Sequence, residues 1–173
     1  MRQLRGTEVK RLMRGYRRQH PPRHEIVALL QSVEYPVNVG SIFRLADALA
    51  LDELILTGIT PTPPNATLHR VARGKEVRVP WRYFRTPEEP IGELKAEGYR
   101  VYALEITDAS VEFTALDYPE RVCLVVGHED HGVTNQTLAL VDGAVYIPMY
   151  GKGRSLNVHV SLAIVVAHLR YGL

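Results

Sequence analysis

The segment 147–157 combines residue types that bind a polar ligand with a spacing that exposes them. An Ile-Pro pair ends an apolar stretch, a loop with Lys152 and Arg154 between glycines follows, and an apolar run begins after Ser155. We expect Ser155 to open a long helix whose free N–H groups face the loop. The segment lacks the GxxxxGK(S/T) spacing of a phosphate loop, so it predicts a ligand site but no NTPase activity.

A second group of polar residues directly follows the apolar run 121–126. The sequence His-Glu-Asp-His at 128–131 lies between two glycines. α/β proteins bind ligands at such turns, where a buried parallel strand ends. Four adjacent side chains in one turn do not converge on one metal ion, and the chain has no spaced pattern such as HExxH. We therefore expect no metal site here and interpret His128 and His131 as polar turn residues.

Asn38 and Arg44 form a third candidate group. The apolar residues around them recur at helical spacing, which predicts a helix over 39–50 with Asn38 near its N-cap. Arg44 interrupts an apolar neighbourhood, which favours a buried or cleft-facing guanidinium that binds a carboxylate or a phosphate. The alternative is an arginine that pairs with Asp47 or another acid, and the residues alone leave both readings open.

Short apolar runs alternate with helical patterns along the whole chain. The runs predict strands because they are short and continuous rather than periodic. Strands that alternate with helices predict an α/β domain built on a mostly parallel sheet flanked by helices. No GxGxxG follows the first strand and no GxSxG occurs, so dinucleotide binding and a nucleophile elbow are unsupported. The expected strands are 25–33, 53–56, 81–84, 99–105, 121–126 and 144–147, and the expected helices before the final one are 4–18, 39–50, 87–97 and 135–141.

Positive charge is concentrated in two segments, although the net charge of the chain is only +2. Residues 1–24 contain eight Lys or Arg and one acid, and residues 67–85 contain six and one. Such clustering is typical of a polyanion binder, so the two segments together favour a nucleic-acid partner. For either segment alone, a solvated arm or an ordinary basic surface is the alternative. Two prolines at 21–22 separate a basic arm, 1–24, from a domain over 25–173.

The composition indicates one ordinary globular domain, with 173 residues of which 46% are apolar and 23% charged. No apolar run is long enough to cross a bilayer, and the charged N-terminus has no signal-peptide pattern. The single cysteine, Cys123, excludes an internal disulfide and fits a buried position in a reducing compartment. We therefore expect a cytoplasmic protein with no membrane partner.

Three short motifs, taken together, resemble a known protein family. They are Asn38-x-Gly-x-x-x-Arg44 with Ala46-Asp-Ala48, Gly127-x-Glu129-x-x-Gly132, and Ile147-Pro-Met149 followed by Ser155-Leu-Asn157. In order and separation they are similar to motifs 1, 2 and 3 of the SpoU (TrmH-type) RNA ribose 2′-O-methyltransferases of the SPOUT superfamily. The resemblance covers about residues 25–170.

The resemblance implies a fold, a cofactor and a set of site residues. The implied fold is an α/β domain with a C-terminal trefoil knot, S-adenosylmethionine bound in the knotted loops, and a homodimer. The implied cofactor-binding positions are Leu104, Gly127, His128, Glu129, Ile147, Met149, Ser155 and Leu156. The implied catalytic positions are Arg44, Asn38, Glu129 and Asn157. Because an arginine stays protonated, we assign Arg44 to orientation and charge stabilisation, and the final acceptor of the hydroxyl proton remains open.

RNA is the substrate that the resemblance implies, with tRNA slightly favoured over rRNA. The candidate RNA-binding residues are basic side chains of the arm, of the second basic segment and of the glycine-rich loop: Arg11, Arg14, Arg17, Arg18, Arg73, Lys75, Lys152 and Arg154. The alternative function is a catalytically inactive RNA-binding module of the same fold. The presence of all the polar motif positions favours the enzyme, since a binding module does not need them.

Two further features bear on the resemblance. His159 stands where the family often has a small residue, which affects substrate details more than the class. The final helix has more apolar residues than one contact face requires, so it either forms a dimer interface or packs into the core. The residues in question are Val158, Leu162, Val165, Val166 and Leu169.

Overall fold

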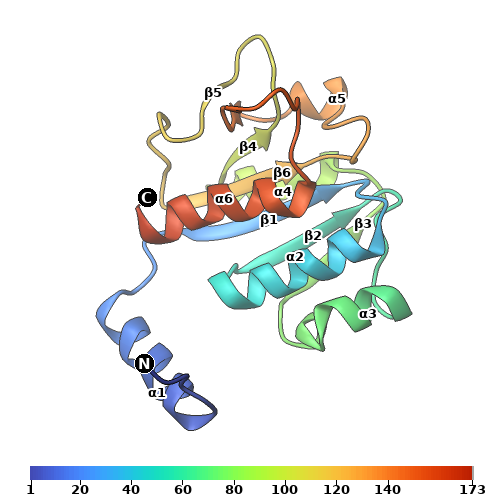
Figure 1. The fold of residues 1–173 in the computed structure, drawn as a ribbon. Coiled ribbons are helices and arrows are strands. Elements are labelled where there is room, and N and C mark those ends of the chain that lie inside the picture. Colours follow the sequence, from blue (N-terminus) through green and yellow to red (C-terminus); the bar gives the residue numbers. More distant parts are fainter. Residues whose placement is uncertain (173) are drawn as a thin grey trace.

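Seven parallel strands form the sheet at the centre of the structure, a computed structural model that describes residues 1–172 (Figure 1). Their order is β3-β2-β1-β6-β4-β7-β5, and each pair of neighbours runs parallel. The predicted α/β fold with a mostly parallel sheet is therefore confirmed. The strands are β1 Glu25–Gln31, β2 Glu53–Thr57, β3 Trp81–Phe84, β4 Arg100–Leu104, β5 Val111–Glu112, β6 Arg121–Val126 and β7 Gly143–Tyr146.

The central strands β1 and β6 are buried on both faces, which explains why their sequences are continuous apolar runs. Along β1, Ile26 and Leu30 belong to one core cluster, whereas Val27 and Leu29 belong to the cluster on the opposite face. Cys123 of β6 is buried, as expected, and this burial raises the pKa of its thiol. The sheet therefore separates two hydrophobic cores.

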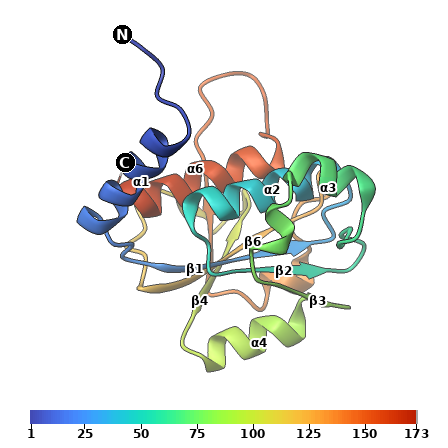
Figure 2. The same cartoon turned by 90° about the horizontal axis from the view of Figure 1, so that it is seen from below.

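Helices cover both faces of the sheet (Figure 2). One face carries α2 (Pro36–Leu49), α3 (Ala66–Ala72) and α6 (Val158–Tyr171), and α2 lies against both of the others. The other face carries α4 (Glu88–Ala96) and the short α5 (Asn135–Leu138), which packs there through its last residue. A single 3-10 turn, η1 (Lys75–Val77), follows α3.

Two helices begin at residues other than those predicted, and both differences affect the candidate site. Helix α2 begins at Pro36, whose fixed φ suits the first helical position, so Asn38 lies inside the first turn and not near the N-cap. Helix α6 begins at Val158 and is capped by the side chain of Asn157, so the prediction that Ser155 opens it was wrong. Both asparagines thereby become available to hold other parts of the chain.

Helix α3 was not predicted. It follows the proline-rich loop and is capped by Asn65, whose side chain accepts a hydrogen bond from the N–H of Leu68 at 3.0 Å. With seven residues it is too short to show a clear helical period in the sequence. The second basic segment is therefore partly helical.

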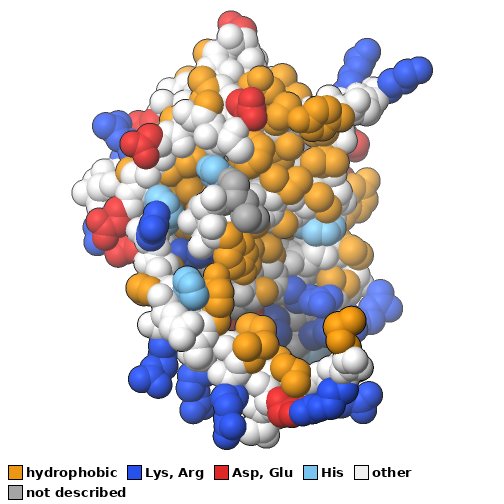
Figure 3. Space-filling model, turned by 60° about the vertical axis from the view of Figure 1, so that its left-hand side comes forward, with side chains coloured by type: hydrophobic (Ala, Val, Ile, Leu, Met, Phe, Trp, Pro, Cys, Tyr) orange, Lys and Arg blue, Asp and Glu red, His pale blue; other side chains and the backbone are white. Residues whose placement is uncertain are grey.

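The basic arm forms α1 (Thr7–Gln19), which stands apart from the sheet (Figure 1). The helix expected at 4–18 is confirmed, and none of its residues is buried. Its Lys and Arg side chains gather along the lower edge of the surface in Figure 3. The division into an arm, 1–24, and a domain, 25–173, stays a prediction.

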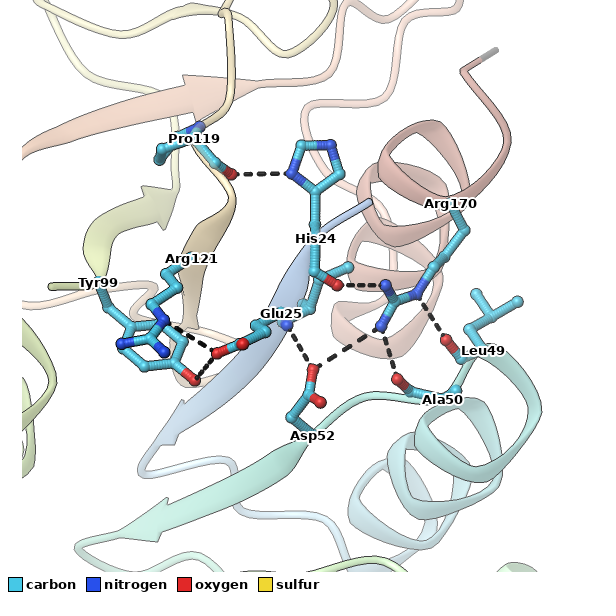
Figure 4. Close-up of polar contacts among 10 residues, drawn as sticks. His24, Glu25, Leu49, Ala50, Asp52, Tyr99, Pro119, Arg121 and Arg170 are labelled. Atoms are coloured by element: carbon cyan, nitrogen blue, oxygen red, sulfur yellow. Dashed lines mark hydrogen bonds and ion pairs between the residues drawn. The ribbon is translucent and has the colours of Figure 1, made fainter. Parts of the chain in front are cut away.

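A polar network closes the amino edge of the sheet (Figure 4). Arg170 of α6 donates hydrogen bonds to the carbonyl oxygens of Leu49 and Ala50, where α2 ends, and to that of His24, which precedes β1. Its guanidinium also lies 3.9 Å from the carboxylate of Asp52. One buried arginine thus joins α6, α2 and β1 at the edge opposite to the candidate site.

Helix α6 is a core helix. Leu162, Val165, Val166 and Leu169 are buried within the same chain, so core packing, and not an interface, accounts for these apolar residues. Within residues 1–172, no helix has both the length and the apolar character needed to span a membrane. The trefoil knot stays a prediction.

Candidate active site

A cavity of about 860 Å³ opens at the carboxyl edge of the sheet, beside the ends of β4, β6 and β7. This is the edge at which open α/β sheets bind ligands. The turn after β6 and the loop before α6 supply polar groups to the cavity. Its apolar walls are formed by Leu104, Val126, Leu138, Val145, Ile147, Met149 and Leu156.

The turn after β6 is closed by its own backbone and by Glu105. The backbones of His128 and Gly132 exchange two hydrogen bonds, of 3.1 and 2.8 Å. A Cβ at Gly127 would lie 2.1 Å from the carbonyl carbon of Gly132, and Gly132 has a φ of +65°, so both positions require glycine. Glu105 accepts a hydrogen bond from the N–H of Val133 at 2.9 Å and joins the end of β4 to the turn. Sequence reasoning missed Glu105, although a polar residue directly after a buried strand was an available signal.

Glu129 extends from this turn to the start of α2. Its carboxylate accepts hydrogen bonds from the backbone N–H groups of Glu34 and Tyr35, at 2.9 and 3.2 Å, and from Nδ2 of Asn38 at 2.7 Å. Burial raises the pKa of Glu129, but the hydrogen bonds from Asn38 and the amides outweigh it, so the pKa lies below its usual value. The group is therefore ionised at neutral pH and ties the turn to the helix.

Asn38 continues this network to α6. Its Oδ1 accepts a hydrogen bond from Nδ2 of Asn157 at 3.1 Å, and Oδ1 of Asn157 accepts one from the N–H of His159 at 3.0 Å. Only 5% of Asn38 is exposed, so its amide has no access to bulk water in place of these partners. Three predicted catalytic positions, one from each motif, are thus in contact although they are far apart in the sequence.

Comparison with known proteins places the chain in a family. Residues 25–167 match the SpoU rRNA methylase family. The chain belongs to this family. The tRNA (guanosine(18)-2′-O)-methyltransferase of Escherichia coli (strain K12) is 31% identical over 160 residues, which are 92% of this chain and 68% of that protein. The 23S rRNA (guanosine(2553)-2′-O)-methyltransferase of Bacillus subtilis (strain 168) is 36% identical over 144 residues, which are 83% of this chain and 57% of that protein.

A solved structure shows the same fold. The crystal structure of the AdoMet-bound rRNA methyltransferase from Sinorhizobium meliloti is similar with a TM-score of 0.81 and 28% identity, over 89% of this chain and 59% of that one. The chain therefore spans about 60% of the length of two of these three proteins and about two thirds of the third. The resemblance inferred from the three motifs is confirmed.

The positions that the SpoU resemblance assigns to the cofactor all line the cavity. They are Leu104, Gly127, His128, Glu129, Ile147, Met149, Ser155 and Leu156. Their role in binding a cofactor is untested by this geometry alone, because a shared cavity does not identify its ligand. Glu105, Asn135 and Tyr146 also line the cavity and were not predicted.

The histidines of the SpoU motif 2 turn serve the turn itself. Nδ1 of His128 accepts a hydrogen bond from the N–H of Asp130 at 3.1 Å, and its Nε2 lies 3.4 Å from the carboxylate of Glu34. The ring of His131 lies against that of His128, with 4.7 Å between their centroids. Within the described part of the chain, no group of three or more His, Cys, Asp or Glu is arranged to hold a metal ion.

Arg44 is exposed on α2 and does not line the cavity, so the expected buried or cleft-facing position was wrong. Six residues beyond Asn38, it lies about 240° around the helix from that residue, which faces α6. The alternative pairing with Asp47 does not occur either, because Asp47 pairs with Lys75 at 3.3 Å. The side chain of Arg44 therefore projects from the outer surface of α2.

The predicted RNA-binding residues fall into three separate places. Arg154 lines the cavity, and Lys152 is exposed in the same loop. Arg73 is exposed where α3 ends. The arm precedes the amino end of β1, so its exposed Arg11, Arg14, Arg17 and Arg18 lie at the edge of the sheet opposite to the cavity (Figure 1). One RNA molecule that contacts all of these residues must therefore extend across the domain.

Proposed function

We propose that the protein is an S-adenosylmethionine-dependent RNA methyltransferase that acts on a ribose 2′-hydroxyl. The observation that carries the proposal is the hydrogen-bonded unit of Asn38, Glu129 and Asn157 at the edge of an apolar-walled cavity. Its support is membership of the SpoU family, whose E. coli and B. subtilis members named above are RNA 2′-O-methyltransferases. The S. meliloti structure holds AdoMet, which supports the same cofactor here.

The residues of the cavity fit S-adenosylmethionine. An adenine ring requires apolar walls, which Leu104, Ile147 and Leu156 provide, and main-chain groups at strand ends, which the turn at 127–132 supplies. The close packing of that turn leaves its backbone, rather than side chains, facing the cavity. When bound, S-adenosylmethionine supplies a methyl group on a positively charged sulfur. Leu104, Ile147, Met149 and Leu156 would hold it and exclude water.

The polar residues order the substrate. Asn38, Glu129 and Asn157 hold one another before any ligand binds, so the free energy of ordering them is not lost during the reaction. Arg44 remains protonated and contributes charge, either to a phosphate next to the target ribose or to the developing oxyanion. Its position on the outer surface of α2 suits an RNA backbone that passes over the helix.

The substrate that we propose is tRNA, slightly ahead of rRNA, in the cytoplasm. The E. coli relative acts on tRNA and the B. subtilis relative on 23S rRNA, so both remain substrates to test. The arm and the second basic segment supply the phosphate contacts, and α1 has no competing partner in the core. Such contacts weaken as salt is raised.

A homodimer is part of the same proposal. Its interface cannot use the buried apolar residues of α6, but exposed apolar side chains surround the site on Tyr35, Val37, Leu156 and Val160. Figure 3 shows hydrophobic side chains gathered over the upper part of one face. A second copy would cover such a surface. Sedimentation that shows only monomers at micromolar concentration would contradict this part of the proposal.

The proposal is tested by methyl transfer from labelled S-adenosylmethionine to a tRNA transcript with guanosine at position 18, and to a 23S rRNA transcript. We expect transfer to a ribose, and calorimetry should show that the protein binds S-adenosylmethionine without RNA. Arg44→Ala should abolish transfer and leave cofactor affinity unchanged. Arg100→Ala removes an exposed arginine at the opposite edge and serves as the control. RNA binding without cofactor binding would instead identify an inactive RNA-binding module.

A further inference from the structure

His159 lies beside the catalytic unit and has no role in the proposed function so far. It is the second residue of α6, is half-buried, and its Nδ1 lies 3.4 Å from Oδ1 of Asn38. That oxygen also accepts the hydrogen bond from Asn157, which lines the cavity. The imidazole is therefore placed at the edge of the site, in contact with a residue that organises it.

The hydrogen-bond network fixes which nitrogen of His159 carries the proton. The ionised carboxylate of Glu129 only accepts, so the amide of Asn38 must present Nδ2 to it and Oδ1 to α6. The amide oxygen of Asn38 also only accepts, so the imidazole nitrogen that faces it must be a donor. His159 is consequently protonated on Nδ1, and its lone pair lies on Nε2.

The surroundings of His159 favour the neutral imidazole. Burial lowers its pKa below the ordinary value of 6.5, and no charged neighbour opposes this effect. Glu129, on the turn after β6, reaches it only through Asn38, while Arg44 is exposed on α2. Arg154 belongs to the loop that precedes α6, and Arg170 lies at the other end of the helix. At neutral pH the ring therefore offers a free lone pair.

We propose that His159 is the proton acceptor of the reaction, that is, the general base for the ribose 2′-hydroxyl. This inference rests on the proposed function. The hydroxyl oxygen forms a bond to the methyl carbon of S-adenosylmethionine and loses its proton to Nε2 of His159. The carbon–sulfur bond breaks and its electron pair stays on sulfur, which becomes a neutral thioether. Solvent then takes the proton from the imidazolium.

The other polar groups of the site are unsuited to this role. The arginines remain protonated, and an amide is not a base. Glu129 already accepts three hydrogen bonds, which stabilise its ionised form and make it a poor proton acceptor. His159 is the group in contact with the unit that combines a neutral ring, a defined tautomer and an unoccupied lone pair.

Two substitutions separate a base from a structural residue. His159→Asn keeps an N–H donor close to the position of Nδ1, and thus the bond to Asn38, but removes the basic nitrogen. His159→Ser removes both. The rate at saturating S-adenosylmethionine and tRNA transcript should fall about 100-fold in both variants, in line with general-base catalysis. Cofactor affinity measured by calorimetry should not change.

The pH dependence gives the sharper readout. The wild-type rate should fall as pH drops through the pKa of His159, below 6.5, because protonation removes the lone pair. Both variants should lose this acid limb. His69→Asn, which alters an exposed histidine on α3, should retain it. A wild-type acid limb and rate in His159→Asn would overturn the inference.

A measurement without substrate tests the tautomer directly. Two-bond ¹H–¹⁵N spectra of the free protein, assigned with His159→Asn, should show Nδ1 protonated and Nε2 unprotonated at neutral pH. The opposite tautomer would overturn the inference whatever the activity. If the wild type transfers methyl groups to neither RNA, the proposed function fails. Transfer by the wild type together with unimpaired His159 variants is the failure of this inference alone.

Discussion

Removing the guanidinium of Arg170 tests whether this residue holds α6 onto the rest of the domain. The side chain is only 7% exposed, and it donates hydrogen bonds to three backbone carbonyls, of Leu49, Ala50 and His24. Two of these carbonyls belong to the end of α2, where a cation also favours the helix dipole. Arg170→Met keeps most of the aliphatic chain and removes all of these interactions.

The expected loss follows from the contacts. Each hydrogen bond contributes about 1 kcal/mol net, so the three together contribute about 3 kcal/mol. Relief of the cost of burying the cation, which lowers the pKa of Arg170, reduces this figure. The pair with Asp52 adds little, because that carboxylate is exposed. We therefore expect Arg170→Met to lower the free energy of unfolding by about 2–3 kcal/mol.

Arg121 supplies the matched control from the same edge of the sheet (Figure 4). It pairs with Glu25 at 3.1 Å and donates to one carbonyl, that of Glu97, but its side chain is 49% exposed. Arg121→Met should therefore cost less than about 1 kcal/mol. The assay is urea unfolding followed by circular dichroism, at one protein concentration for all variants. Equal losses in Arg170→Met and Arg121→Met would refute the reasoning.

Two further predictions concern Glu129 and the arm. The lowered pKa of Glu129 means that its carboxylate stabilises the fold fully above its unfolded value of 4.5 and loses this effect as pH falls through the lower folded value. In urea unfolding, the gap between wild type and Glu129→Gln should therefore shrink below pH 4.5, and a constant gap would contradict this. Replacing four arginines of α1 by glutamine should reduce the slope of log binding constant against log salt for tRNA by about 3, whereas an unchanged slope would show that the arm does not contact phosphate. The four are Arg11, Arg14, Arg17 and Arg18.

The strands and the position of the site were predictable because they depend on local patterns. The run 121–126 is buried on both faces, which requires a continuous apolar sequence whatever the rest of the chain does. A parallel sheet brings the carboxyl ends of its strands to one edge, so the polar residues after them had to meet there. The motif resemblance then named the positions that line the cavity.

The partners of the site residues were not predictable from sequence. The start of α2 was misjudged because Pro36 begins the helix, which moved Asn38 from a capping position into contact with Glu129, 91 residues away. A contact at that separation depends on how the elements pack, and no local period encodes it. For Arg44, the apolar neighbours indicated a buried side, but the helical angle placed the guanidinium on the outer one.

The network explains why the catalytic positions must be considered as one unit. Glu129 accepts hydrogen bonds from two amides and from Asn38, so it sets the orientation of that amide, and this orientation in turn sets the tautomer of His159. A carboxylate that is committed to this task cannot also remove a proton from the substrate. The structure thus separates the residue that orients the site from the residue that we expect to accept the proton. A change at Glu129 should therefore impair catalysis through His159, even though the two side chains do not touch.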